Sequence, residues 1–252
     1  MTEEMNPGGR TAVVTGASRG LGAGLAAEFA RRGLRLGLCA RSQPALVDSE
    51  TVVSARVDVR DEEALYRFAD RVADRFGDID LWVNNAGVLG PVGPLRELPV
   101  PAFREHIDTN LTGVFLGMRA YVRHLRARGA RGVLVNISSG AAWHGYHGWS
   151  AYCASKAAVE RLTECVQLEE GEHLRAHAVA PGVIDTDMQV QVRACSPEQF
   201  PDVGRFEERK RQGQFNTPGF VARHLLRIAF DPGAGSCELA IRLPDEWDAP
   251  HG

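Results

Sequence analysis

The chain has 252 residues, of which 44% are hydrophobic and 24% charged, and its formal net charge is −3 at pH 7. This length suits one large α/β domain or two small ones, and a chain of this size buries a sizeable core without disulfides. The slight negative charge and the lack of basic clusters argue against binding to nucleic acids or anionic membranes, and no apolar run approaches the roughly 18–20 residues that cross a bilayer.

Strand-like and helical segments alternate along the chain. Residues 1–10, MTEEMNPGGR, lack the charged and then apolar layout of a signal peptide, so we predict a flexible leader there. The next apolar run, 11–15, predicts a buried strand. A helix follows, whose apolar residues recur at helical spacing and which Gly33 ends.

The remaining elements continue this alternation. Asp61 is predicted to cap a helix that Gly77 ends, and long helices are predicted over 103–128 and 151–170. Further strands are predicted at 34–39, 52–57, 79–83, 132–138, 175–179 and 237–242. We therefore expect an α/β fold in which 11–252 form a single Rossmann-type domain, a doubly wound parallel sheet of seven strands with helices on both faces.

One connection is shorter than a parallel crossover normally allows. Only 40–51 join the second and third strands, and this segment holds little more than a turn or two of helix. We expect thin cover on the sheet face at that point.

A serine, a tyrosine and a lysine form the most informative pattern. Tyr152 and Lys156 are four residues apart, so they share one face of a helix. An ammonium at that place favours phenolate over phenol, which allows Tyr152 to exchange a proton near neutral pH. Ser139, delivered from the preceding strand, can hold the substrate oxygen that receives the proton. The pattern predicts a general-acid site for reducing a carbonyl, or for the reverse reaction.

A glycine-rich loop, TGASRGLG, follows the first strand and opens the first helix. Its glycines permit a tight turn and let a pyrophosphate approach the N–H groups at the positive helix end. A glycine-rich turn without a ligand is the alternative, and the strand–turn–helix context favours the ligand. The residues predicted to bind there are Gly16, Ser18, Arg19, Gly20, Leu21 and Gly22.

The end of the second strand is predicted to select the cofactor. An acidic side chain there would bind the ribose hydroxyl of NAD, but no Asp or Glu occurs between Phe29 and Val47. Arg41 and Ser42 stand at this point, and with Arg19 they form a reasonable clamp for the 2′-phosphate of NADP(H). Solvated surface arginines are the alternative; the missing carboxylate favours NADP(H).

Other strand ends complete the predicted cofactor site. Asp58, followed by Val59, can accept from the adenine amino group or can equally be a turn residue. The segment Asn85, Ala86 and Gly87 follows the fourth strand, and its small residues would let the cofactor ribose lie close.

With TGASRGLG, NNAG, Ser139, Tyr152-x-x-x-Lys156 and APG in this order, the chain resembles the short-chain dehydrogenase/reductase family over residues 10–242. The resemblance implies a Rossmann fold that moves hydride between a nicotinamide and an alcohol or carbonyl. It implies that Tyr152 is the general acid/base, that Lys156 lowers its pKa and binds the nicotinamide ribose, and that Ser139 holds the carbonyl oxygen. Asn110 would anchor a water linking Lys156 to solvent. Holding the nicotinamide carboxamide would fall to Pro181, Gly182, Val183 and Thr186.

The downstream sequence resembles the sepiapterin reductase branch of that family, which includes bacterial benzil reductases and uses NADPH. Pterin-reducing members carry an acidic anchor near the last strand. Here Glu238 and Asp245 are poor substitutes by position, so a neutral aromatic or dicarbonyl substrate is expected rather than a pterin.

Aromatic residues gather between Ser139 and Tyr152. Trp143, Tyr146 and Trp149 are predicted to form a wall for a flat, partly apolar substrate, with packing or a subunit interface as the alternative. The intervening histidines lack a third ligand, so no metal site is expected. Residues 187–216, with Met188 facing the substrate, are predicted as a mobile lid; an ordinary surface excursion is the alternative.

These patterns lead to one function and two alternatives. We predict an NADPH-dependent carbonyl reductase acting on a small ketone or vicinal dicarbonyl, aromatic compounds included. A catalytically silent dinucleotide sensor and an NAD-dependent alcohol dehydrogenase remain as alternatives. The two long helices carry extra apolar residues and pair across a dimer axis in the family, so a homodimer is expected. The five cysteines form no CxxC pair, which suggests reduced thiols and a cytoplasmic protein.

Overall fold

The computed structural model describes residues 7–231 and 238–248. The first six residues of the predicted leader and Cys237, where the last strand was predicted to begin, lie outside the described residues. The described end of the leader is held in place, because Gly9 donates to the Gly33 carbonyl (3.1 Å) and Arg10 pairs with Asp80 (2.8 Å).

The centre of the molecule is a parallel sheet of seven strands, which confirms the predicted fold class. From edge to edge the order is β3-β2-β1-β4-β5-β6-β7, so the chain reverses direction across the sheet between β1 and β4. The strands are β1 (Thr11–Thr15), β2 (Arg35–Ala40), β3 (Val52–Arg56), β4 (Leu81–Asn84), β5 (Gly132–Ile137), β6 (Leu174–Ala180) and β7 (Ala240–Arg242).

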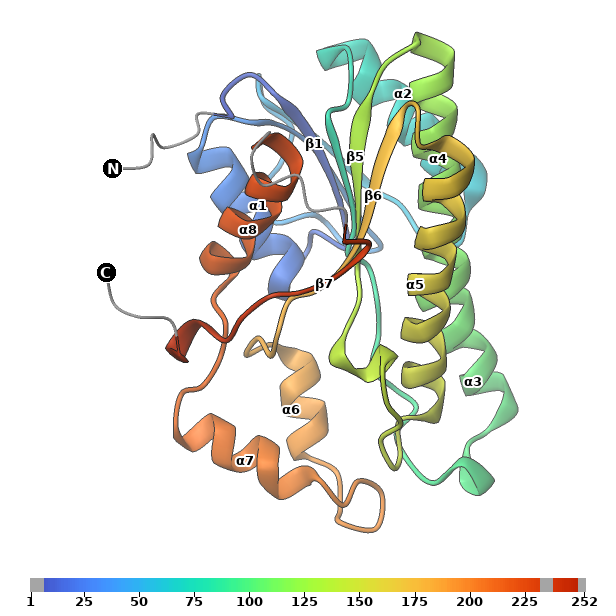
Figure 1. The fold of residues 1–252 in the computed structure, drawn as a ribbon, viewed down its shortest axis with the longest axis vertical. Helices are drawn as coiled ribbons and strands as arrows, with labels where there is room; N and C mark the ends of the chain where they lie inside the picture. Colours follow the sequence, from blue (N-terminus) through green and yellow to red (C-terminus); the bar gives the residue numbers. More distant parts are fainter. Residues whose placement is uncertain (1–6, 232–237, 249–252) are drawn as a thin grey trace.

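Helices cover both faces of the sheet (Figure 1). One face packs against α1 (Gly20–Arg31) and α8 (Pro218–Phe230) through a core that includes Leu25, Phe29 and Leu225. The other face packs against α2 (Glu62–Phe76), α4 (Gly113–Arg128) and α5 (Ser150–Glu170) through a second core. Two shorter helices, α6 (Asp187–Arg193) and α7 (Val203–Arg211), lie below the sheet in Figure 1, beyond the carboxyl ends of the strands. None of the helices in the described parts of the chain has the length and apolar character needed to cross a membrane.

The helix predicted over 103–128 is interrupted. It consists of α3 (Val100–Ile107), a π-helical turn at Asp108–Thr112, and α4. A π turn inserts one extra residue into the helical ladder and often occurs at functional sites. Here it carries Asn110, whose side chain is fully buried.

No helix forms between β2 and β3, as the short connection predicted. The segment is instead anchored by Asp48, which accepts from the backbone N–H of Ser54 (2.5 Å), and by Ala45, which donates to the Ala17 carbonyl (3.1 Å). Partly buried Leu46 packs against the core and covers the sheet there.

A row of buried polar side chains joins β4 and β5 to α5. The Trp82 indole donates to Asn84 (2.8 Å), Asn84 donates to Asn136 (2.9 Å), and Asn136 donates to the Thr163 hydroxyl (2.9 Å). Buried polar groups of this kind are costly when unpaired, so the row fixes α5 at one position along the strands. That position determines where Tyr152 and Lys156 meet the sheet.

Candidate active site

The carboxyl ends of the strands open into a cavity of about 1220 Å³. Nearly all residues predicted to bind cofactor or substrate line it, although they come from segments far apart in the sequence. Those brought together are Gly16, Ser18, Arg19, Gly20, Leu21, Gly22, Arg41, Ser42, Asp58, Val59, Asn85, Ala86, Gly87, Ser139, Tyr146, Trp149, Tyr152, Lys156, Pro181, Gly182, Val183, Thr186 and Met188. Asn110 and Trp143 lie outside the lining.

The glycine loop is shaped by contacts that exclude side chains. Gly16 has φ +69°, and a Cβ at this residue would lie 2.7 Å from the Ala86 backbone. At Gly22 a Cβ would lie 2.4 Å from the Gly16 carbonyl oxygen. Gly22 is thus required by the packing of the loop on itself, while the N–H groups that open α1 border the cavity.

Thr15 and Asn85 hold the loop against the end of β4, and sequence reasoning missed this role of Thr15. The Thr15 hydroxyl accepts from the N–H groups of Asn85 (3.0 Å) and Ala86 (3.1 Å). The Asn85 side chain donates to the Thr15 carbonyl (2.9 Å). Asn85 therefore contacts the loop that borders the cavity, and its side-chain amide is committed to that support.

Of the residues predicted to bind the 2′-phosphate, Arg19 is engaged in an ion pair within the described chain. Arg41 and Ser42 are exposed and line the cavity. Arg19 pairs with Asp187 (2.7 Å). Asp58 receives Nε (3.0 Å) and Nη2 (2.6 Å) of Arg60, which lowers the pKa of its carboxyl. Asp58 thus behaves as a turn residue held by Arg60 while it also faces the cavity.

Lys156 is buried, with 6% of its surface exposed, and its Nζ donates to the Ile137 carbonyl at the end of β5 (2.7 Å). Burial lowers the pKa of this ammonium from 10.5 to about 8. Most of the lysine therefore still carries its charge at pH 7, but it loses that charge at a lower pH than an exposed lysine does.

The expected acidification of Tyr152 is absent from this structure. Burial raises the pKa of Tyr152, and a hydrogen bond with Ser139 opposes that rise only in part. The reason is geometric, since the Lys156 ammonium is directed at Ile137 and lies 5.6 Å from the centre of the Tyr152 ring. The phenol therefore keeps its proton at neutral pH.

Glu160, one helical turn beyond Lys156, ties the serine segment to α5. Its carboxylate accepts from the Ser138 hydroxyl (2.7 Å) and from the Trp143 indole (2.9 Å). This explains why Trp143 does not line the cavity and corrects its assignment to the substrate wall, because the residue is 42% exposed and its indole N–H is bound to Glu160. Helical spacing from Tyr152 and Lys156 was a signal that could have identified Glu160.

The Asn110 side chain is held by both backbone groups of Val88. Its amide oxygen accepts from the Val88 N–H (2.8 Å), and its amide nitrogen donates to the Val88 carbonyl (2.8 Å). His106 lies 3.1 Å from the same nitrogen and 3.1 Å from the Ser155 hydroxyl, and its ring meets that of Tyr152 edge-on. Burial lowers the pKa of His106, so this histidine, which sequence reasoning missed, supports the site in neutral form.

The substrate side of the cavity is aromatic. Trp149 stacks on Phe200 with ring centres 4.6 Å apart and meets Tyr146, Tyr152 and Phe206 at 5.1–5.6 Å. Met188 packs against the same cluster. The part of the chain that the structure describes contains no group of three or more His, Cys, Asp or Glu side chains placed to hold a metal ion.

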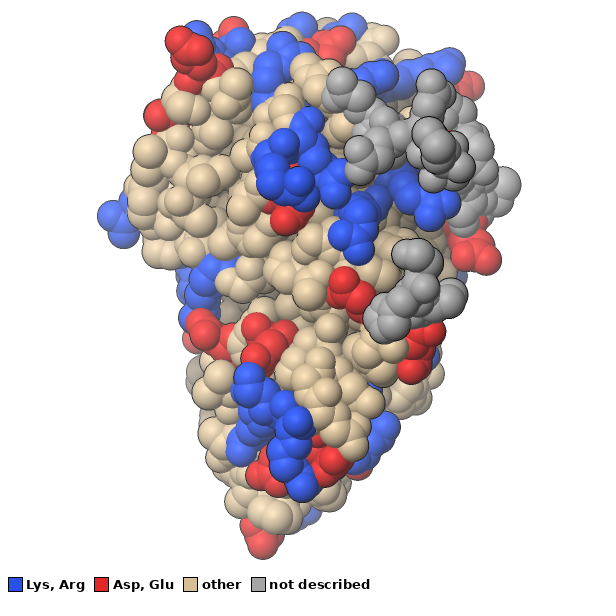
Figure 2. Space-filling model, turned by 90° about the vertical axis from the view of Figure 1, so that its left-hand side faces the viewer, with Lys and Arg blue, Asp and Glu red and all other residues tan. Residues whose placement is uncertain are grey.

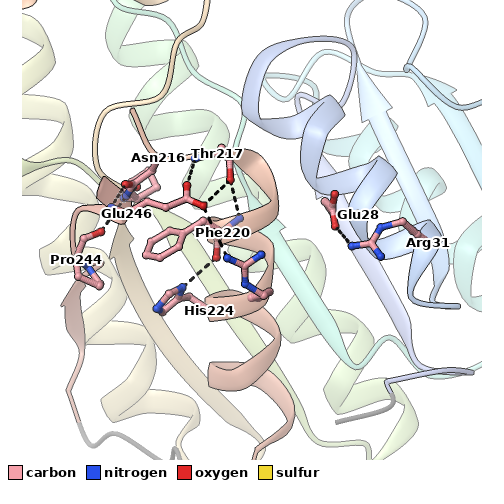
Figure 3. Close-up of polar contacts among 10 residues, drawn as sticks. Glu28, Arg31, Asn216, Thr217, Phe220, His224, Pro244 and Glu246 are labelled. Atoms are coloured by element: carbon pink, nitrogen blue, oxygen red, sulfur yellow. Dashed lines mark hydrogen bonds and ion pairs between the residues drawn. The ribbon is translucent and has the colours of Figure 1, made fainter. Parts of the chain in front are cut away.

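Asn216, which is buried and absent from the sequence-based site, supports the loop that holds Pro181 and Gly182. Figure 3 shows it next to Pro244 and Glu246. Its amide nitrogen donates to the carbonyls of Pro181 (2.9 Å) and Pro244 (3.0 Å), and its oxygen accepts from the Glu246 N–H (2.7 Å). The Glu246 carboxylate in turn accepts from the Thr217 N–H (2.6 Å).

This clamp brings the segment after β7 to the cavity. Asp245 lines the cavity, although its place in the sequence made it a poor candidate for a substrate anchor. Glu238 precedes β7, and its backbone carbonyl contacts His177 (2.9 Å).

The described residues fit a nicotinamide dinucleotide. The glycine loop has no room for a Cβ at Gly16 or Gly22, and it presents backbone N–H groups at the start of α1. The small residues Ala86 and Gly87 line the cavity after the fourth strand. The cavity continues from this loop to the Ser139, Tyr152 and Lys156 side chains.

Comparisons with known proteins agree with this geometry. A family model described as short chain dehydrogenase matches residues 10–196. Benzil reductase ((S)-benzoin forming) of Bacillus subtilis (strain 168) is 32% identical over 224 residues, which span 86% of this chain and 91% of that protein. The crystal structure of the KRED1-Pglu enzyme is 32% identical, with a TM-score of 0.79 over 88% of this chain and 95% of that one. A structure of an ElxO variant with NADPH bound is 26% identical, with a TM-score of 0.77 over 92% and 96%.

The buried ammonium predicts a pH-dependent cost to stability. Because folding lowers the pKa of Lys156 from 10.5 to about 8, the unfolded chain binds more protons than the folded one in this window, and stability from this group rises with pH. We expect Lys156→Met to be more stable than the wild type at pH 7 in the absence of cofactor, and this advantage to shrink by about 3 kcal/mol towards pH 10.5. Urea unfolding of both proteins across that range measures the difference. Parallel stability curves would contradict the prediction.

Proposed function

The chain belongs to the short-chain dehydrogenase family of oxidoreductases, which act on hydroxyl and carbonyl groups, and within it we propose an NADPH-dependent carbonyl reductase that transfers hydride to a ketone or vicinal dicarbonyl. The observation that carries this proposal is the state of Tyr152. Tyr152 is partly buried, and its phenol keeps its proton and is hydrogen-bonded to Ser139 in the same cavity as the glycine loop. A tyrosine in this state suits a proton donor better than a base.

Each side chain then has a defined task. NADPH, when bound, supplies the hydride for the carbonyl carbon. Ser139 holds the carbonyl oxygen and stabilises the negative charge that develops on it. Tyr152 gives its proton to that oxygen. Lys156, whose pKa is about 8, lies one helical turn from Tyr152 and can help to return a proton to it. Asn110 would anchor a water that links Lys156 to solvent.

The preference for NADPH rests on charge. Among the described residues no ion pair engages Arg41, which lines the cavity at the end of β2 next to Ser42. Arg19 is close enough to Asp187 to be paired, and a 2′-phosphate would compete for it. We propose that these three residues bind that phosphate, and that Pro181 and Thr186 border the nicotinamide.

The two other functional hypotheses receive less support. A catalytically silent sensor need not retain the side chains of the reaction, yet Asn110, Ser139, Tyr152 and Lys156 all occur at one end of the cavity or directly behind it. An alcohol dehydrogenase working oxidatively needs Tyr152 as a base, which the raised pKa of its phenol disfavours.

We propose that 187–216, which form α6 and α7, act as a lid over the substrate. Both helices contribute to the cavity lining, and Val192, Phe200 and Val203 pack under them against Trp149. Tyr146, Trp149 and Met188 form the apolar wall that a substrate would meet.

A homodimer is also proposed, through α4 and α5, which lie side by side on the right of Figure 1. Large apolar side chains are exposed on both helices, at Phe115 (41%) and Leu168 (81%). Exposed apolar groups of this size are common at subunit interfaces.

Replacing the proton donor tests the reaction. We expect Tyr152→Phe to lower kcat for any accepted ketone by about 10²–10⁴-fold, because the phenol proton is lost, while NADPH binds with an unchanged Kd. Steady-state NADPH oxidation and a fluorescence titration measure the two quantities. Tyr66→Phe, which removes a hydroxyl bound to Glu62 on α2, is the matched control and should retain activity. Near-normal turnover by Tyr152→Phe would refute the assignment.

The cofactor preference is tested at Arg41. We expect Arg41→Asp to lower the ratio of kcat/KM for NADPH to that for NADH by roughly 10–100-fold, since a charged hydrogen bond to the phosphate is replaced by repulsion. Arg75→Asp, an equal change of charge on the exposed side of α2, should leave the ratio unaltered. A wild-type enzyme that prefers NADH would overturn the proposed preference.

The subunit arrangement is tested by mass in solution. Light scattering on the purified protein should return twice the chain mass of 27.4 kDa. Phe115→Glu combined with Leu168→Glu should shift the protein towards the monomer, because charge would be buried in the interface. Leu95→Glu, at an apolar residue equally exposed elsewhere (76%), is the control. A monomeric wild type would exclude the homodimer.

A further inference from the structure

Resting on the proposed function, we infer that the outer end of the cavity binds an anionic group of the substrate, held by Arg205 and Arg209 of α7. Both residues line the cavity. They are four residues apart, so their side chains emerge on one face of the helix. Figure 2 views the side of the molecule on which α7 lies, and in the lower part of the molecule it shows a group of basic side chains with acidic ones beside them.

Packing fixes the rotation of α7. Phe206 meets Trp149 and Phe200 with ring centres 5.6 and 5.5 Å away, and Val203 is buried beneath the helix. With these two residues turned inward, the helix keeps Arg205 and Arg209 at the cavity. The packing therefore fixes which face of α7 carries the two guanidinium groups.

A second contact locates Arg209. Its guanidinium lies over the Trp247 ring, 5.0 Å from the ring centre. Trp247 follows Glu246, which Asn216 and Thr217 hold through the clamp shown in Figure 3. A stacked guanidinium keeps the edge of its fork available for a planar anion.

The charges around these arginines are unbalanced. Glu208 lies on the same face but is engaged by Arg211 and by the Gln212 amide (2.6 Å). Among the described residues no carboxylate forms an ion pair with Arg205 or Arg209. Like charges at this helical spacing repel, and an anion placed between them would remove that repulsion.

Two more charged groups line the cavity from the end of β7 and the segment after it. Asp245 is the opposing charge, and no ion pair joins it to the residues that the structure describes. Arg242 lies three residues before it and also lines the cavity. The three arginines outweigh the two carboxylates, Asp245 and the Glu208 that Arg211 already neutralises, so this end of the cavity attracts anions.

Aromatic contacts connect the anion site to the reacting groups. Trp149 touches Tyr152 on one side and Phe206 on the other, each with ring centres 5.6 Å apart. A substrate with its carbonyl at Tyr152 would lie along these rings and reach Arg205 and Arg209 with its far end. The substrate class is therefore a ketone with an apolar or aromatic body and a carboxylate, sulfonate or phosphate at the other end.

Matched acids and amides test this inference. The probes are phenyl ketones with two to five methylene groups between the ketone and a terminal carboxylate, each paired with its carboxamide. We expect the wild type to favour the acid over the amide by at least roughly 10-fold in kcat/KM at the best chain length. The double variant Arg205→Gln/Arg209→Gln should lose this preference through KM and reduce the amides as before. Sulfonate and phosphonate analogues of that length identify the preferred anion.

Two controls separate local binding from general charge. Arg67→Gln, on the far helix α2, should change neither series. Asp245→Asn should lower KM for the acids, the opposite of the arginine variants. Calorimetry with 5-phenylpentanoate and its amide in the presence of NADP⁺ gives a readout that needs no turnover, and the acid should bind more tightly only when both arginines are present.

The outcomes distinguish this inference from the proposed function. Equal use and equal binding of acids and amides at every chain length would overturn the anion site and leave the reductase standing. Preferential binding of the acid without reduction of any ketone would overturn the reductase alone. If the double variant weakened NADPH binding and affected acids and amides equally, the arginines would belong to the cofactor site and the inference would be wrong.

Discussion

The site depends on one buried cation. Lys156 is enclosed between α5 and the end of β5, where the Ile137 carbonyl is its only hydrogen-bond acceptor among the described residues. Removing an ammonium from water is expensive, and the structure shows that expense as the depressed pKa of Lys156. The fold tolerates it because the row from Trp82 to Thr163 fixes α5 on the sheet. Burying Lys156 thus lowers the folding stability of the protein but keeps a polar group beside Tyr152.

The polar side chains around the cavity mainly join segments of the chain to one another by hydrogen bonds. Thr15 joins the end of β1 to the end of β4, Glu160 joins the serine segment to α5, and Asn216 joins the loop after β6 to the chain after β7. Because the strands are parallel, all these loops lie at the carboxyl ends of the strands, but this arrangement does not fix the loops against each other. Side-chain hydrogen bonds supply that precision.

Sequence periodicity was sufficient for the fold, because strands buried on both faces and amphipathic helices leave local patterns. Asp61 as a helix cap and the helix-free segment before β3 followed from the same local rules. The place of Trp143 outside the cavity lining and that of Asp245 within it were not predicted, because both depend on tertiary contacts, with Glu160 in one case and the Asn216 clamp in the other. The pKa of Tyr152 was predicted in the wrong direction because spacing reveals a neighbouring cation but not the burial that opposes it.

The cofactor loop and the proposed lid are joined by a contact that is weak enough to break. Arg19 immediately precedes α1 and Asp187 begins α6, so their ion pair links the two elements directly. Both side chains are about two-thirds exposed (67% and 66%), and exposed pairs contribute roughly 1 kcal/mol at most. A phosphate that drew Arg19 away would release the start of α6. The arginines of α7 belong to the same segment, so the charge of the cofactor and that of the substrate would both act on the proposed lid.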